Sequence, residues 1–166
     1  METRKVLNRE NQPTEQLRRT VHTNYNGFKL TYDEVYYLDE EVDEESGNVI
    51  KEKLVPHYTK EQMNRNLRSL KSAYLIEKGA ASPDEIIEFR RKHNIAASTL
   101  SIIIGFSKNT ISNIENEGIT SLPSGRLIKM CITDPSLLLR YIILCDAIDH
   151  QKKEELAQRI LRTESE

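Results

Sequence analysis

Small polar side chains between Ser107 and Asn116 form the segment of this chain whose residue types and spacing could do chemistry. Gly105 and an apolar segment precede them, so the stretch 97–116 has the pattern of two short helices joined by a tight turn. The polar groups would lie on the outer face of the second helix. Hydroxyl and amide groups recognise other molecules through hydrogen bonds, and proteins present a helix to the major groove of DNA in this way. The stretch therefore predicts a binding surface on a helix.

A close pair of helices places specific demands on the sequence. A small residue must stand where the first helix crosses the second, and Ser101 occupies that position. The turn needs a residue that tolerates a positive φ, which Gly105 supplies. Ser107 follows the turn and could cap the second helix. The positions that face inward must be apolar, and they are Leu100, Ile104, Phe106, Ile111 and Ile114.

With these demands met, residues 83–132 resemble the XRE-type family of phage repressor and Cro-like DNA-binding domains. The resemblance is strongest in the segment 111–116, which precedes Gly118. It implies that outward side chains near the start of the second helix read bases. Asparagine can bond to adenine through two hydrogen bonds, and lysine suits guanine or a phosphate. The matching positions are Lys108, Asn109 and Asn113, with Thr110 nearby.

The same resemblance implies phosphate contacts. Ser98, Thr99 and Ser107, with the backbone amides at the helix starts, would hold phosphates. The family's frequent glutamine at the start of the first motif helix is Ala97 here, so one expected contact is missing. The competing interpretation is that a polar outer face on a short helix is merely solvated. The complete two-helix pattern favours DNA binding over that alternative.

Composition is typical of a globular protein. The chain has 166 residues, of which 37% are hydrophobic and 30% charged, and its net charge is −2. Residues 33–47 contain eight acids and no base, so the local field near a contacting helix matters more than the net charge. No apolar run approaches the roughly 18 residues of a membrane span, and no signal-peptide core follows Met1. We therefore expect a cytoplasmic protein without a membrane partner.

The amino-terminal half is expected to begin with a flexible tail over 1–22, followed by a small β-rich unit with a linking helix over 23–80. Thr59 and Gln62 fit a capping box at the start of the linking helix, which ends near Gly79. The β-prone segments predict a meander of about three strands, at 28–32, 35–38 and 49–55, with a turn at 46–48. The apolar stripe of the helix could face the sheet or form part of a dimer seam, and it comprises Met63, Leu67, Leu70 and Tyr74.

The carboxy-terminal half is expected to form a helix-turn-helix domain over 81–150 and a charged C-terminal helix or tail over 151–166. Ser82 and Pro83 signal the start of its first helix, and Asp134 opens its last one. That last helix is apolar almost all round, so both of its faces should be covered. The expected fold class is α+β. A small N-terminal β-meander with a linking helix precedes an all-α, five-helix domain of lambda-repressor-like type.

The order of these elements carries a wider resemblance, to MqsA-type antitoxins of toxin–antitoxin pairs. It covers most of residues 24–145, in the stretches 24–28, 67–74 and 82–114. Those antitoxins often hold zinc with two cysteine pairs in the amino-terminal unit. The two cysteines of this chain, Cys131 and Cys145, both follow that unit and lie in apolar helical stretches, where we expect them to be small buried side chains. The resemblance implies a toxin protein as a partner, without that zinc site.

Patterns of catalytic and metal sites are missing from the sequence. The four histidines, His22, His57, His93 and His150, lie far apart and show no metal-ligand spacing. There is no glycine-rich phosphate loop and no nucleophile elbow. We expect no enzyme activity, no catalytic residue, no cofactor and no bound metal.

Two further features bear on partners. Ile102 and Ile103 occupy motif positions that commonly face water, so another helix, subunit or protein should cover at least one of them, unless the core is simply larger. The acidic segment 38–45 could mimic phosphate charge or meet a basic toxin, or it could be a solvated hairpin loop.

These observations predict a sequence-specific DNA-binding transcriptional regulator. A homodimer paired through its last helix would place two recognition helices about 34 Å apart on double-stranded DNA with a palindromic operator. The resemblance implies an antitoxin-like autorepressor of a toxin–antitoxin operon. Two alternatives remain open: a phage-type repressor without a toxin, and a protein-interaction module that keeps the helix-turn-helix as a scaffold.

Overall fold

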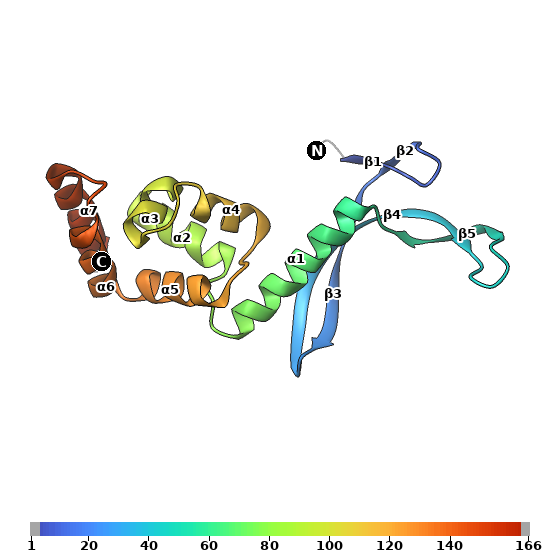
Figure 1. Cartoon of the computed structure of the whole chain (residues 1–166), viewed down its shortest axis with the longest axis horizontal. Coiled ribbons are helices and arrows are strands. Elements are labelled where there is room, and N and C mark those ends of the chain that lie inside the picture. The colour runs from blue at the N-terminus through green and yellow to red at the C-terminus, as the bar shows by residue number, and fades with distance from the viewer. Residues whose placement is uncertain (1–3, 164–166) are drawn as a thin grey trace. The chain divides into compact units, whose positions relative to one another are not determined.

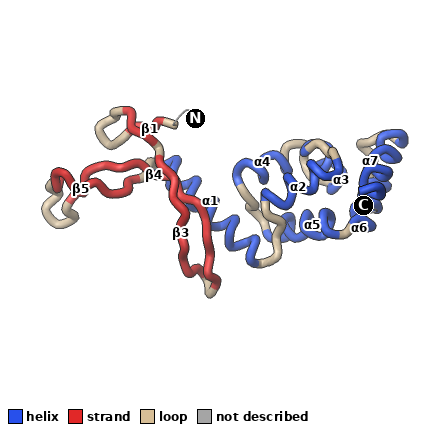
Figure 2. The backbone as a smooth tube through the Cα atoms, turned by 180° about the vertical axis from the view of Figure 1, so that it is seen from behind, coloured by secondary structure: helices blue, strands red, loops and turns tan. Residues whose placement is uncertain are grey.

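The fold is α+β, as predicted. The computed structural model describes residues 4–163 and divides into two compact units at Leu70 and Lys71, within helix α1 (Lys60–Glu77). Figure 1 labels the elements, and Figure 2 shows the strands confined to the first unit. The division comes ten residues before the expected boundary at 80, because Leu75 in the last turns of α1 belongs to the core of the second unit.

Two antiparallel sheets form the first unit. Strands β3 (Leu17–Tyr25), β4 (Phe28–Val42) and β5 (Val49–His57) make a three-stranded sheet in that order. Strands β1 (Lys5–Leu7) and β2 (Pro13–Glu15) make a separate two-stranded sheet. The segments predicted at 28–32 and 35–38 are therefore one continuous strand, while the strand predicted at 49–55 is confirmed as β5.

The expectation of a flexible tail over 1–22 is wrong for the described residues. Strand β3 pairs with β4 along its whole length, from Leu17 opposite Tyr36 to Tyr25 opposite Phe28. Its turn consists of Asn26 and Gly27, whose φ angles are 47° and 83°. Asparagine followed by glycine adopts these left-handed conformations at low cost and favours a two-residue hairpin. This dipeptide was the signal that could have identified the strand.

The first turn of α1 is capped as predicted. The Thr59 amide donates to Gln62 Oε1 at 2.9 Å, and the Gln62 amide donates to Thr59 Oγ1 at 3.1 Å. The apolar stripe of α1 does not cover the sheet, however. Met63 is 54% exposed and Leu67 62% exposed. The prediction that this stripe faces the sheet is wrong for these two side chains.

A buried asparagine explains why the inner side of α1 is polar. Strand β5 pairs with β4 only from Tyr37 onward, so the backbone of Val35 is open on that edge. Asn66, 6% exposed, fills the gap: its Oδ1 accepts from the Val35 amide and its Nδ2 donates to the Val35 carbonyl, each at 2.9 Å. The side chain of a helix thus supplies the hydrogen bonds that a neighbouring strand would make.

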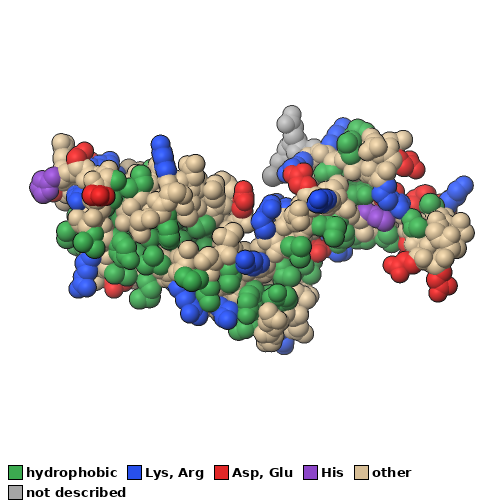
Figure 3. Space-filling view, viewed as in Figure 1, with side chains coloured by type: hydrophobic (Ala, Val, Ile, Leu, Met, Phe, Trp, Pro, Cys, Tyr) green, Lys and Arg blue, Asp and Glu red, His purple; other side chains and the backbone are tan. Residues whose placement is uncertain are grey.

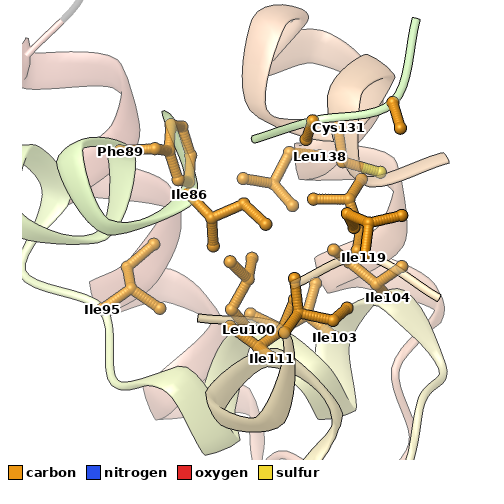
Figure 4. Close-up of a cluster of buried hydrophobic side chains, with 14 of the residues drawn as sticks. Ile86, Phe89, Ile95, Leu100, Ile103, Ile104, Ile111, Ile119, Cys131 and Leu138 are labelled. Carbon is orange, nitrogen blue, oxygen red and sulfur yellow. The ribbon is translucent and has the colours of Figure 1, made fainter. Parts of the chain in front are cut away.

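The second unit is all-helical in the part that the structure describes. Ser82 caps its first helix, as predicted, and the structure shows that Ser82 and Glu85 form a complete capping box. The helices that follow are α2 (Pro83–His93), α3 (Ala97–Ile104), α4 (Thr110–Glu117), α5 (Leu122–Thr133), α6 (Pro135–Leu144) and α7 (His150–Thr163). Ile86, Leu100 and Ile111, from three of these helices, converge in its core (Figure 4).

Helix α7 extends this core beyond the expected limit at 150. Leu156 is 1% exposed and Ile160 is fully buried, and both belong to the same cluster as the α2–α6 side chains. The charged helix or tail expected over 151–166 is a helix in its described part, and it joins the core because two apolar residues four positions apart face inward despite the charged composition around them. Residues 164–166 of the expected tail lie outside the described residues.

Helix α6 is covered on one side and open on the other. Leu138 and Ile142 are buried, whereas Ile143 is 72% and Leu144 78% exposed. The expectation that both faces are covered is therefore wrong for the single chain. Ile103 is 2% exposed, which confirms that one of the adjacent isoleucines is covered, by the core of this unit itself.

Both cysteines are buried and unbridged, as expected for small core side chains. Burial raises the pKa of the Cys131 thiol to about 11, so the thiolate is scarce at neutral pH. Among residues 4–163, no helix combines the length and the apolar character needed to cross a membrane.

Asn66→Leu should destabilise the first unit. It leaves the buried Val35 amide and carbonyl without partners, at about 1–3 kcal/mol for each group. Loss of protection of the Val35 amide in hydrogen exchange measures this effect. Asn64→Leu, at an exposed position of the same helix, is the matched control and should leave that protection unchanged. Equal protection in the two variants would contradict the role of Asn66.

Candidate nucleic-acid interface

Helix α4 is anchored at its start by a side chain of α3. Gly105 ends α3 with a φ of 91°, and the Phe106 amide donates to the Ser101 carbonyl at 2.9 Å. The chain then returns so closely that the fully buried Ser101 Oγ accepts from the Ile111 amide at 2.9 Å. The predicted small residue at the crossing therefore also satisfies a backbone donor of the first turn of α4.

The predicted cap at Ser107 is wrong in its mechanism. The residue at the N-cap of α4 is Asn109, whose side chain makes no capping hydrogen bond. The Ser107 hydroxyl lies 2.8 Å from Thr110 Oγ1 instead of bonding to a helix amide. Because Ser101 already occupies the Ile111 amide, the side chains of Ser107 and Asn109 are left at the surface.

A second anchor joins α4 to α2 through an ion pair that sequence reasoning missed. Arg90 Nε donates to Glu115 Oε1 at 2.6 Å, and Arg90 Nη2 donates to Glu115 Oε2 at 2.7 Å. The Arg90 side chain is 21% exposed and the Glu115 side chain 11%. Two parallel hydrogen bonds fix orientation as well as distance. The pair also neutralises one acid of α4, whereas the other, Glu117, is exposed and lines the hollow beside this helix.

The predicted base-reading residues are accessible. Lys108, Asn109 and Asn113 are exposed, and Thr110 is half-buried. Thr110 and Asn113 lie together along an open hollow of about 240 Å³ between α4 and the segment leading into α5. Hydroxyl-bearing Thr120, Ser121 and Ser124 line the same hollow. The structure thus groups hydrogen-bonding side chains at the exposed side of α4.

The predicted phosphate contacts fall into two places. Ser98 and Thr99 are half-buried in the first turn of α3, whose N-cap residue, Ala96, provides no side-chain hydrogen bond. Ser107 lies in the turn before α4 and is exposed. Two groups of hydrogen-bond donors therefore stand at the starts of consecutive helices.

The acidic segment 38–45 lies in the first unit, partly in β4 and partly in the turn before β5. The hydrogen bond from Arg9, at 3.0 Å, lowers the pKa of Asp39, and the Ser46 amide lowers the pKa of Asp43. Lys53 forms an ion pair with Glu41. These contacts belong to a hairpin whose acids are partly matched within the unit, which favours the hairpin interpretation over an open charge surface.

Comparison of the chain with models of protein families and with curated proteins returns no match. Within residues 4–163, no cluster of three or more histidine, cysteine, aspartate or glutamate side chains is arranged to hold a metal ion. Function is therefore inferred from the geometry of α3 and α4.

Ser101→Ala should loosen α4. It removes the acceptor of the Ile111 amide, which costs about 1–2 kcal/mol of folding free energy. Urea denaturation followed by circular dichroism measures the change. Ser98→Ala, on the same helix and away from this hydrogen bond, is the control. If both variants lose the same stability, the capping role of Ser101 is refuted.

Proposed function

We propose that this protein is a sequence-specific DNA-binding transcriptional regulator whose α3 and α4 form a helix-turn-helix of the lambda-repressor type. The observation that carries the proposal is a short helix held by two anchors, Ser101 to Ile111 and Arg90 to Glu115, with its polar side exposed. Base recognition needs a rigid helix, because a hydrogen bond to a base edge discriminates only when its donor is held in place.

Each exposed polar residue has a role in this proposal. Asn109 and Asn113 bond to adenine edges in the major groove, and Lys108 bonds to guanine or a phosphate. Thr110 supports them from the first turn of α4. Ser98, Thr99 and Ser107, with the amides of the helix starts, hold the DNA backbone.

The regulator acts as a homodimer on a palindromic operator. Support comes from the open side of α6, where Ile143 and Leu144 are 72% and 78% exposed at adjacent positions. Apolar side chains also reach the visible surface of the helical unit in Figure 3. Large adjacent apolar residues favour an interface, and two copies paired through α6 would present two α4 helices to successive major grooves.

The finer proposal is an antitoxin-like autorepressor that binds the promoter of its own operon and a toxin protein. It rests on the resemblance over 24–145 to MqsA-type antitoxins. In those proteins zinc often holds the amino-terminal unit, whereas here Asn66 and the β3–β4 hairpin hold the sheet. A promoter fragment from the protein's own operon is therefore the first DNA to test.

Asn109→Ala and Asn113→Ala should each weaken binding to that operator by about 1–3 kcal/mol while leaving the fold intact. Each substitution removes an exposed amide without creating a cavity. Fluorescence anisotropy with the labelled promoter fragment measures the affinity. Asn64→Ala, an equally exposed asparagine on α1, should bind like the wild type. Unchanged affinity of both α4 variants would reject their base-reading roles.

Ile143→Glu should shift the protein toward monomer. A buried isoleucine at an interface contributes about 1.5–3 kcal/mol, so the dimer dissociation constant should rise about tenfold or more. Sedimentation velocity over a range of concentrations measures this shift. Gln158→Glu, at an exposed position of α7, controls for the added acid. A dimer that survives Ile143→Glu unchanged would assign the interface elsewhere.

A further inference from the structure

A second hollow in the helical unit carries an unusual concentration of positive charge. It measures about 360 Å³ and lies between the end of α2, the start of α3 and helix α7. Four of its lining side chains are cationic and none is a carboxylate. The cations are Arg90, Arg91, Lys152 and Arg159.

The described contacts of these cations hold their side chains at the hollow. Arg90 is neutralised by Glu115. Arg159 Nη1 donates to the Asn94 carbonyl at 3.0 Å, an uncharged acceptor that holds the guanidinium beside the end of α2. Lys152 Nζ lies 3.7 Å from Glu155, a long contact between two partly exposed groups that is worth little in water. Arg91 is exposed at the hollow.

The two cations of α7 that line the hollow lie on one face of the helix. Lys152 and Arg159 are seven residues apart, which is two helical turns, so both face the same side of the helix. Leu156, between them, is buried and fixes that side against the core. The helix therefore delivers two positive charges to one hollow by the same packing that completes the core.

The remaining walls favour an oxygen-rich anion. Thr99 contributes a half-buried hydroxyl, and Ala96 at the N-cap leaves the first amides of α3 without a side-chain acceptor. Cationic side chains, together with hydroxyl and amide donors, suit a phosphate group better than a single carboxylate. The hollow is open to solvent at the surface of the unit, so the phosphate can be part of a polymer.

We propose that this hollow binds a backbone phosphate of duplex DNA and that α7 is part of the DNA-binding surface. The inference rests on the proposed function and deepens it. Thr99 connects the two, because it lines the hollow and lies on α3, the helix whose far end leads into the turn that carries Lys108. Through Lys152 and Arg159, α7 holds the DNA backbone beside the major groove that α4 enters.

Salt dependence of binding tests this assignment without knowledge of the operator. Wild type, Arg91→Gln, Lys152→Gln and the double variant are titrated by fluorescence anisotropy against a duplex of unrelated sequence over a range of KCl concentrations. Each lost phosphate contact should reduce the slope of log affinity against log salt by about 1, and lower the affinity roughly eightfold at about 0.1 M salt. Arg162→Gln, which removes an exposed charge of α7 that does not line the hollow, should match wild type.

The outcomes separate this inference from the proposed function. If wild type binds the duplex and the double variant keeps the slope of Arg162→Gln, the hollow does not hold the backbone and DNA binding by α4 stands. If wild type binds no duplex even at low salt, the DNA-binding function and this inference fail together.

Inorganic phosphate is the second probe. If it raises the melting temperature of wild type but not of the double variant, while their duplex affinities agree, the site takes a small phosphate and the duplex assignment is overturned. Circular dichroism of each variant checks that it folds.

Discussion

The buried hydroxyl of Ser101 and the paired side chains of Arg90 and Glu115 fix the position of α4, and the exposed residues around that helix depend on them. A helix of eight residues has little stability of its own in water. Here its first turn is capped from α3 and its carboxylate is held from α2. These contacts are satisfied inside the unit, and the side chains of Lys108, Asn109 and Asn113 remain exposed.

In the first unit, a helix side chain likewise makes hydrogen bonds that a neighbouring strand would otherwise make. Strand β5 does not reach the edge of β4 at Val35, and Asn66 bonds to that backbone in its place. Met63 and Leu67 lie beside these buried polar positions on α1, and both face solvent. A helix position whose side chain bonds to the backbone of a strand must be polar, so it cannot also make apolar contacts with that strand.

The composition of helix α7 does not indicate that the helix packs into the core. Its sequence is mostly polar or charged, yet Leu156 and Ile160 complete the core of the helical unit. The same turns bring Lys152 and Arg159 to the hollow beside α3. Packing and charge are therefore coupled on this helix, since a substitution that displaces Leu156 would also move the cations away from that hollow.

The sequence alone determined the features that depend on residues a few positions apart. The capping boxes at Thr59 and Ser82, the glycine turn at Gly105 and the polar segment after it are local, because each is formed by neighbours along the chain. Only the tertiary structure decided which side of α1 is buried, that α7 joins the core, and that Arg90 meets Glu115. Burial and ion pairing depend on elements distant in the sequence, and no spacing rule connects residues whose proximity exists only after the chain has folded.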